Sequence, residues 1–127
     1  MTDCVAIGDS IAVGISMASH CVNMAQVGRT SSQQAAIIKK VSTDVAVISL
    51  GSNDPTNPEL LRNLRRVRAA TDAGRVVWIM PYKGYPREAV VRIASEYRDG
   101  VLDLKSFATA DHVHPSNYKQ VAKEIFK

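Results

Sequence analysis

The sequence has little cysteine, with only two in 127 residues, and no apolar run long enough to cross a membrane. Two cysteines are too few for a disulfide-rich scaffold, and the spacing of Cys4 and Cys21 does not match a zinc site. We expect both to be small buried residues. A bridge between them is conceivable if their strands are neighbours, but it is not expected. The chain as printed also lacks a basic segment followed by an apolar stretch, so we expect no export signal and no membrane span.

The sequence also lacks the glycine patterns that bind nucleotide phosphates. The segment "IGDSIAVG" has no G-x-x-x-x-G-K-[ST] pattern, and Gly8 and Gly14 do not form G-x-G-x-x-G. A helix N-terminus that binds phosphate depends on such a loop. Nucleotide binding is therefore not expected.

Basic residues exceed acidic ones only slightly, 16 to 12, for a formal charge of +4. Four arginines gather in "RNLRRVR" at 62–68, but apolar residues between them have amphipathic helical spacing. No aromatic residue is interleaved with these arginines, as single-strand binding surfaces require. We interpret the segment as a solvated outer face of a helix and expect no nucleic-acid partner.

What the sequence does contain is typical of a globular fold. Hydrophobic residues make up 46% and charged residues 22%, with no linker, low-complexity tract or repeat. A chain of this size buries enough surface for one core. We therefore expect one domain over 1–127.

Short runs rich in valine and isoleucine alternate with helical patterns. Strands are predicted at 4–7, 21–24, 45–50, 75–80 and 100–104. Helices are predicted at 10–19, 57–74 and 86–100 and from 116 to the end. A further helix is predicted to begin at a capping box formed by Ser31 and Gln34. Five such alternations predict an α/β fold with a parallel sheet covered on both faces.

Polar residues follow four of the five predicted strands. They occur at 9–10, 28–29, 51–54 and 111–114. In open parallel sheets, ligands bind outside the carboxyl ends of the strands. These four loops are therefore expected to converge at one edge of the sheet and to form the site.

Ser10 stands where the first strand turns into a helix. One explanation is that Ser10 caps the helix. The other is that its hydroxyl is a nucleophile, which requires a base. His114 can be that base, and Asp111, three residues earlier, has the spacing to orient its imidazole. His20, at the end of the first helix, is expected to be exposed and without a role.

Acyl transfer also needs donors aimed at the developing negative charge. Asn53 carries an amide N–H in the loop after "VISL", and Gly28 permits a close approach to its backbone. Each is also an ordinary turn residue. Their coincidence with Ser10 and His114 favours the catalytic interpretation.

These residues resemble the sequence blocks of the GDSL esterases, or SGNH hydrolases. "GDSI" is similar to the first block, Gly28 in "VGRTS" to the second, "GSND" to the third and "DHVHP" to the last. The resemblance implies a three-layer, flavodoxin-like sandwich with strand order 2-1-3-4-5. It also implies a serine esterase without metal or cofactor, with Ser10, His114 and Asp111 as the triad. The oxyanion hole would comprise the N–H groups of Ser10 and Gly28 and the side chain of Asn53.

Two departures from the family pattern bear on the substrate. Ile11 replaces the leucine of the family name, a small apolar change. The chain is short and leaves no room for a lid, so a shallow acyl site and short, acetyl-type esters, such as O-acetyl groups on carbohydrates, are expected. A glycan- or protein-binding module on the same fold is the alternative. Thioester, amide and phospholipid substrates and the oligomeric state remain open.

Several other residues have two interpretations. Tyr82, Lys83 and Tyr85 either line the substrate cleft or shape a connection. Arg29 either meets an anionic group or is solvated. Three further residues have structural interpretations: Asp54 and Asn57 as turn and cap residues, and Trp78 as part of the core.

Overall fold

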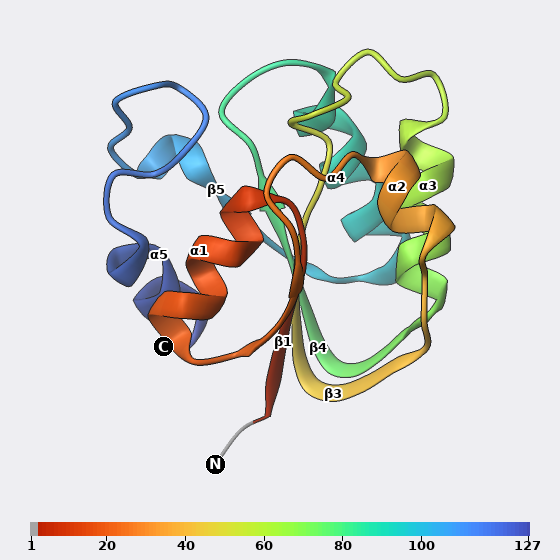
Figure 1. Ribbon diagram of the computed structural model, residues 1–127, viewed down its shortest axis with the longest axis horizontal. Coiled ribbons are helices and arrows are strands. Elements are labelled where there is room, and N and C mark those ends of the chain that lie inside the picture. The colour runs from red at the N-terminus through yellow and green to blue at the C-terminus, as the bar shows by residue number, and fades with distance from the viewer. Residues whose placement is uncertain (1–2) are drawn as a thin grey trace.

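Five runs of β-branched and other apolar residues form one parallel sheet in the computed structural model, which describes residues 3–127. The strands lie in the order β2-β1-β3-β4-β5 (Figure 1). This is the predicted order. Their bounds are β1 (Cys4–Gly8), β2 (Val22–Ala25), β3 (Val41–Ser49), β4 (Thr71–Met80) and β5 (Gly100–Asp103).

Helices cover both faces of this sheet, which gives the predicted three-layer, flavodoxin-like sandwich (Figure 1). One face carries α1 (Ser10–Ser19) and α5 (Tyr118–Ile125), which pack against each other. The other carries α2 (Ser31–Ala36), α3 (Leu60–Ala69) and α4 (Tyr85–Tyr97). One turn of 3-10 helix, η1 (Leu104–Ser106), follows β5. No helix within residues 3–127 has the length and apolar character to cross a bilayer.

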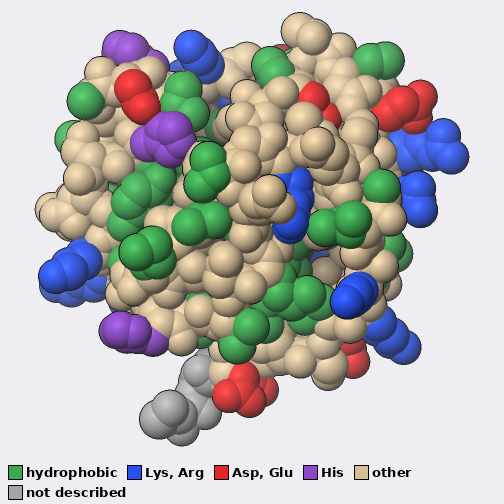
Figure 2. All heavy atoms as spheres, viewed as in Figure 1, with side chains coloured by type: hydrophobic (Ala, Val, Ile, Leu, Met, Phe, Trp, Pro, Cys, Tyr) green, Lys and Arg blue, Asp and Glu red, His purple; other side chains and the backbone are tan. Residues whose placement is uncertain are grey.

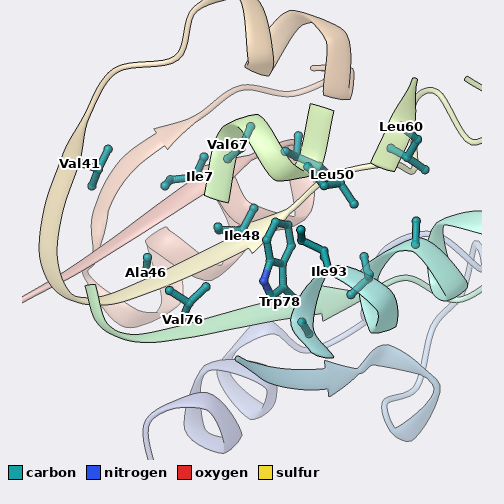
Figure 3. Packing of buried hydrophobic residues seen from close by; sticks show 14 of the residues in the cluster. Ile7, Val41, Ala46, Ile48, Leu50, Leu60, Val67, Val76, Trp78 and Ile93 are labelled. Carbon is teal, nitrogen blue, oxygen red and sulfur yellow. The ribbon is translucent and has the colours of Figure 1, made fainter. Parts of the chain in front are cut away.

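The core has two parts, one on each face of the sheet. Successive residues of β3 alternate between them, because side chains along a strand point to opposite faces. Ile48 packs with Trp78 and the apolar faces of α3 and α4 (Figure 3), whereas Val47 packs with α1 and α5. Burial on both faces explains the continuous apolar runs in β1 and in the second halves of β3 and β4, whereas the edge strands β2 and β5 contain no buried residue. Trp78 is fully buried, as predicted.

Several predicted boundaries were wrong. Helix α2 begins with a capping box formed by Thr30 and Gln33, one residue earlier than the predicted pair. Helix α3 ends at Ala69, and Gly74 lies inside β4 instead of ending the helix. Strand β4 begins at Thr71 because this polar stretch pairs in register with the start of β3. Tertiary pairing outweighs local composition here.

Three of the four arginines of α3, namely Arg62, Arg65 and Arg66, are exposed as predicted, but two of the four pair with acids outside the helix. Arg65 contacts Glu96 at 2.6 Å, and Arg68 contacts the largely buried Asp99 at 2.8 Å. Both acids belong to α4 or the residues that follow it, so these pairs tie two neighbouring helices together. On the face drawn in Figure 2, Lys and Arg side chains are dispersed over the surface.

Cys4 and Cys21 form a disulfide, contrary to our expectation. The register explains the bond: Val5 pairs with Val22, so Cys4, in β1, and Cys21, directly before β2, lie side by side. Their Cα atoms are 4.9 Å apart, within the usual range for a bridge. The predicted strands placed Cys4 correctly and Cys21 one residue too far along, since β2 begins at Val22, and sequence alone did not reveal this register.

Candidate active site

The turn between β1 and α1 fixes the position of Ser10. Gly8 has φ +128°, and a Cβ atom there would lie 1.9 Å from the carbonyl oxygen of Ser49, so only glycine fits. Asp9 caps the helix, since its Oδ1 accepts the N–H of Ile11 at 3.1 Å. Ser10 is therefore the first residue of α1 and not its cap. Its hydroxyl is available for another partner.

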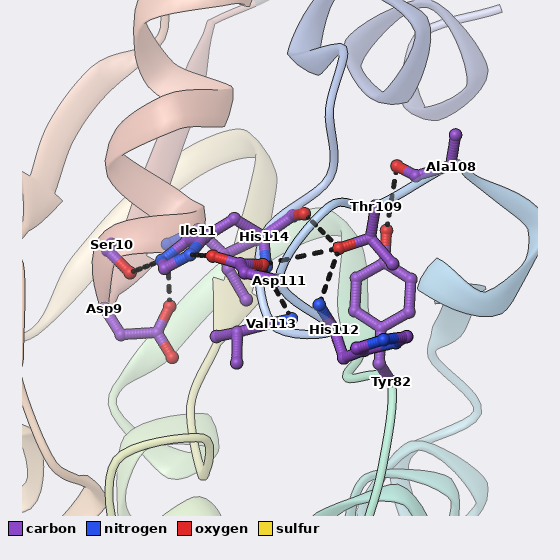
Figure 4. A network of polar contacts seen from close by, with 10 residues as sticks. All are labelled: Asp9, Ser10, Ile11, Tyr82, Ala108, Thr109, Asp111, His112, Val113 and His114. Carbon is purple, nitrogen blue, oxygen red and sulfur yellow. Dashed lines mark hydrogen bonds and ion pairs between the residues drawn. The ribbon is translucent and has the colours of Figure 1, made fainter.

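That partner is His114, which lies 104 residues further along the chain. Ser10 Oγ and His114 Nε2 are 2.7 Å apart, and His114 Nδ1 lies 2.8 Å from Asp111 Oδ2 (Figure 4). The hydroxyl, imidazole and carboxylate thus form one continuous hydrogen-bonded chain. This arrangement can move a proton from the hydroxyl to the imidazole while the carboxylate stabilises the resulting charge.

The loop that carries His114 is held by its own polar groups. Asp111 Oδ1 accepts the backbone N–H groups of Val113 and His114 at 2.9 and 2.7 Å. Thr109 Oγ1 donates to the carbonyl of His114 at 2.6 Å and accepts the N–H of His112 at 3.0 Å. The N–H and ring of His114, and the N–H of Val113, hold the pKa of Asp111 well below its ordinary value. Asp111 is therefore ionised at neutral pH.

The candidate oxyanion donors lie on neighbouring loops. Because β1 lies between β2 and β3, Ser10 is flanked by the loops that carry Gly28 and Asn53. Within residues 3–127, the backbone N–H groups of Ser10 and Gly28 donate no hydrogen bond. Gly28 has φ +81° and open space where a side chain would stand. Asn53 Nδ2 donates to the carbonyl of Arg29 at 3.0 Å, which orients the amide and leaves its second N–H available.

Asp54 joins the Gly28 and Asn53 loops, a role that sequence analysis missed. Its Oδ1 accepts the N–H of Ser31 at 3.0 Å, and its Oδ2 accepts the Ser31 hydroxyl at 2.5 Å. Asn57 Nδ2 donates to the same carboxylate at 3.0 Å. Asp54 is thus more than the turn residue we predicted. The cap prediction for Asn57 was wrong, because the N-cap of α3 is Glu59; Asn57 Oδ1 accepts the N–H of Glu59 in the turn before the helix. No local pattern indicates a contact across 23 residues.

A cavity of about 360 Å³ lies beside the triad. Its lining comes from the loops after β3 and β4, from the start of α4, and from the loop that carries Asp111 and His114, which we call the triad loop. It includes Pro55, Tyr82, Lys83, Tyr85 and Val113. Tyr82, Lys83 and Tyr85 line this cavity together, and their role in a substrate cleft stays a prediction. Ser10 does not line this cavity.

Arg29 is not simply solvated. Its guanidinium donates to the carbonyl of Met24 at 3.1 Å and to the side chains of Gln34 and Gln26 at 3.0 and 3.1 Å. Those contacts shape the loop around Gly28. Among residues 3–127, no group of three His, Cys, Asp or Glu side chains is placed to hold a metal ion.

The fold is similar to those of two solved structures, and this likeness makes it a GDSL/SGNH-like fold. A member of the lipolytic G-D-S-L family from Veillonella parvula matches with a TM-score of 0.71 and 14% identity, over 99% of this chain and 97% of that one. A GDSL-like lipase from Bacteroides thetaiotaomicron matches with a TM-score of 0.64 and 14% identity, over 98% of this chain and 84% of that one. No family model matches the sequence. No curated protein matches it either.

Proposed function

We propose that this protein is a serine esterase that hydrolyses short-chain, acetyl-type esters, with O-acetylated carbohydrates as one expected substrate class. The observation that carries the proposal is the hydrogen-bonded chain from Ser10 Oγ through His114 to Asp111, at 2.7 and 2.8 Å. A hydroxyl at a helix N-terminus, joined to an oriented imidazole, is the arrangement of an activated nucleophile.

In the proposed first step, Ser10 Oγ attacks the acyl carbon while His114 Nε2 takes the hydroxyl proton. Asp111 stays ionised and stabilises the imidazolium. The negative charge on the former carbonyl oxygen would be bound by the N–H groups of Ser10 and Gly28 and by the second N–H of Asn53. The C–O bond to the alcohol then breaks, and His114 gives its proton to the leaving oxygen.

The second step releases the acid. Water attacks the acyl group on Ser10, and His114 takes a proton from that water. The same donors stabilise the second tetrahedral intermediate, and the proton returns to Ser10 Oγ as the acid leaves. His114 supplies the acid and base catalysis in both steps, so this mechanism requires no metal or cofactor.

The preference for short acyl groups rests on the position of Ser10. The cavity of about 360 Å³ is lined by His112 and Val113 of the loop that carries His114, but not by Ser10. An acyl group on Ser10 therefore has little enclosed apolar surface to occupy, and each added methylene gains little from burial. The cavity is better placed to take the alcohol part of the ester.

The test is hydrolysis of p-nitrophenyl esters of increasing acyl length. We expect activity on the acetate that falls with chain length. In Ser10→Ala and His114→Ala, kcat should drop by about three orders of magnitude or more. His20→Asn is the matched control, since His20 is exposed at the far end of α1 and Asn tolerates its left-handed backbone. Its activity should equal that of the parent.

A serine-directed phosphonate gives a second measurement. It should label Ser10 in the parent and fail to label His114→Ala. If the parent hydrolyses none of the esters and Ser10 stays unlabelled, the esterase proposal is wrong. The non-catalytic glycan- or protein-binding module then becomes the function to test.

A further inference from the structure

A second cavity, of about 440 Å³, adjoins the first one on the side away from Ser10. The two cavities share Tyr82, Lys83 and His112. Figure 4 shows His112 beside Tyr82, on the side of the triad loop that faces away from Ser10. The second cavity is further lined by Lys105 and Phe107, among other residues. We call it the basic cavity.

Three different segments bring the basic side chains together. Lys83 belongs to the connection between β4 and α4, Lys105 to η1, and His112 to the triad loop. Tyr82, which is buried, joins two of these segments because its hydroxyl donates to the carbonyl of Phe107 at 3.1 Å. The grouping is therefore a product of the fold and not of a run of basic residues.

The charges around the basic cavity are unbalanced. None of its lining residues is acidic. Of the two nearest carboxylates along the chain, Asp103 is paired with the guanidinium of Arg87 at 2.8 and 2.9 Å, whereas Asp111 keeps its negative charge and directs Oδ2 to His114 Nδ1. Neither lysine of the cavity forms an ion pair within residues 3–127. Two lysines, Lys83 and Lys105, thus stand against one uncompensated carboxylate, and the positive charge that remains can attract an external anion.

We propose that the basic cavity binds an anionic group, a carboxylate, sulfate or phosphate, carried by the alcohol part of the ester. This inference rests on the proposed esterase function. An acetyl group is too small to carry a charge into a neighbouring cavity, so the anion must belong to the alcohol. The first cavity, with its proline and tyrosine lining, would hold the ring of that alcohol. An O-acetylated acidic sugar has this combination of ring and charge.

The test compares two acetyl esters that differ in charge, 4-acetoxybenzoate and its neutral methyl ester. Each kcat/KM is divided by the rate of hydroxide-catalysed hydrolysis, which corrects for intrinsic reactivity. We expect the corrected ratio of anionic to neutral ester to exceed one and to fall with added salt. Lys83→Met and Lys105→Met should each lower this ratio by about two- to fivefold, as for an exposed ion pair.

Lys40→Met is the matched control, because Lys40 is exposed just before β3, at the opposite end of the sheet from the site. It removes the same charge and should leave the ratio unchanged. If the two cavity variants leave the ratio as it is in the parent, or if Lys40→Met lowers it equally, the basic cavity is not an anion site.

Binding separates this proposal from the proposed function. In Ser10→Ala, 4-acetoxybenzoate should bind more tightly than the methyl ester by isothermal titration, and the double lysine variant should lose that difference. This result would support the anion site even if the parent hydrolysed neither ester, in which case the esterase proposal alone fails. Equal binding of the two esters would overturn the anion site.

Discussion

Asp9 is the residue whose environment is least favourable to its charge. The carboxyl is fully buried between β1 and α1, and within residues 3–127 its Oδ2 has no hydrogen-bond partner. Burial raises its pKa from an ordinary 3.8 to about 6, although the N–H of Ile11 acts in the opposite direction. The same residue caps α1 directly before Ser10, so an unfavourable charge lies beside the candidate nucleophile.

This raised pKa predicts how stability depends on pH. The folded state binds the Asp9 proton more tightly than the unfolded state does, so the contribution of Asp9 to the free energy of unfolding falls as pH rises from about 4 to about 6. By pH 7 the loss is complete and amounts to about 3 kcal/mol. Asp9→Asn keeps a capping oxygen without the charge.

We therefore expect Asp9→Asn to raise the free energy of unfolding at pH 7 by about 1–3 kcal/mol and to flatten its pH dependence between pH 4 and 6. Urea unfolding at several pH values measures both effects. Asp72→Asn is the control, because Asp72 is exposed at the start of β4. A variant of Asp9 that is less stable than the parent at pH 7, with unchanged pH dependence, would contradict the assignment.

At the scale of elements, the candidate oxyanion hole depends on two loops that follow different strands. Gly28 follows β2 and Asn53 follows β3, and the bonds from Asp54 to Ser31 hold these segments together. The network continues into α3, where the buried Asn63 donates to the hydroxyl of Ser31 at 3.0 Å. Asp54 acts in this arrangement as a positioning residue for the proposed donors.

Removing this link should affect the transition state more than substrate binding. We expect Asp54→Ala to lower kcat on an acetyl ester by about 10- to 100-fold with little change in KM, because misplaced donors lose their stabilisation of the oxyanion. Asp54→Asn, which keeps an acceptor for the Ser31 N–H, should recover part of the loss. Steady-state kinetics with both variants tests this expectation.

Ser31→Ala is a milder variant that deletes one of the two bonds and should lower kcat less than Asp54→Ala does. Circular dichroism of each variant shows whether the fold is kept. If folded Asp54→Ala has the kcat of the parent, or if KM rises while kcat is constant, Asp54 does not position the donors.

The same elements show what could be predicted from the sequence. The apolar runs located all five strands. Burial on both faces accounts for the runs of β1, β3 and β4, whereas β2 and β5 are edge strands that contain no buried residue. The start of β4 was missed because Thr71 and Asp72 are extended only by pairing with β3. The cap of α2 was placed one residue late, since Ser31 has capping chemistry but its hydroxyl is used by Asp54.

The candidate site could be predicted where each residue carries its own chemistry. Ser10, Asp111 and His114 follow strands and have spacings that suggest their roles, and the topology brings them within hydrogen-bonding distance. The contact of Asp54 with Ser31 had no such signal, because both residues are common in turns. The basic cavity had none either, since it collects single residues from three segments.

At the scale of the whole molecule, the disulfide and the candidate site lie at opposite ends of one strand. Strand β1 begins at Cys4 and ends at Gly8, directly before the turn that carries Ser10. The bridge encloses α1 in a loop with a sequence separation of 17. A closed loop of this length restricts the unfolded chain, which stabilises the folded state by about 3 kcal/mol.

Reduction should therefore lower stability without altering the site. We expect the double variant Cys4→Ser/Cys21→Ser to lose about 2–4 kcal/mol in free energy of unfolding. Its kcat/KM on an acetyl ester at 25 °C should match that of the parent, because Gly8, Asp9 and Ser10 are held by β3 and α1 at the far end of the strand. Urea unfolding with and without dithiothreitol measures the first effect, and reductant should leave the variant unchanged. Equal stability of parent and variant would contradict the bond, whereas a loss of kcat/KM in the folded variant would show that β1 transmits the change to the site.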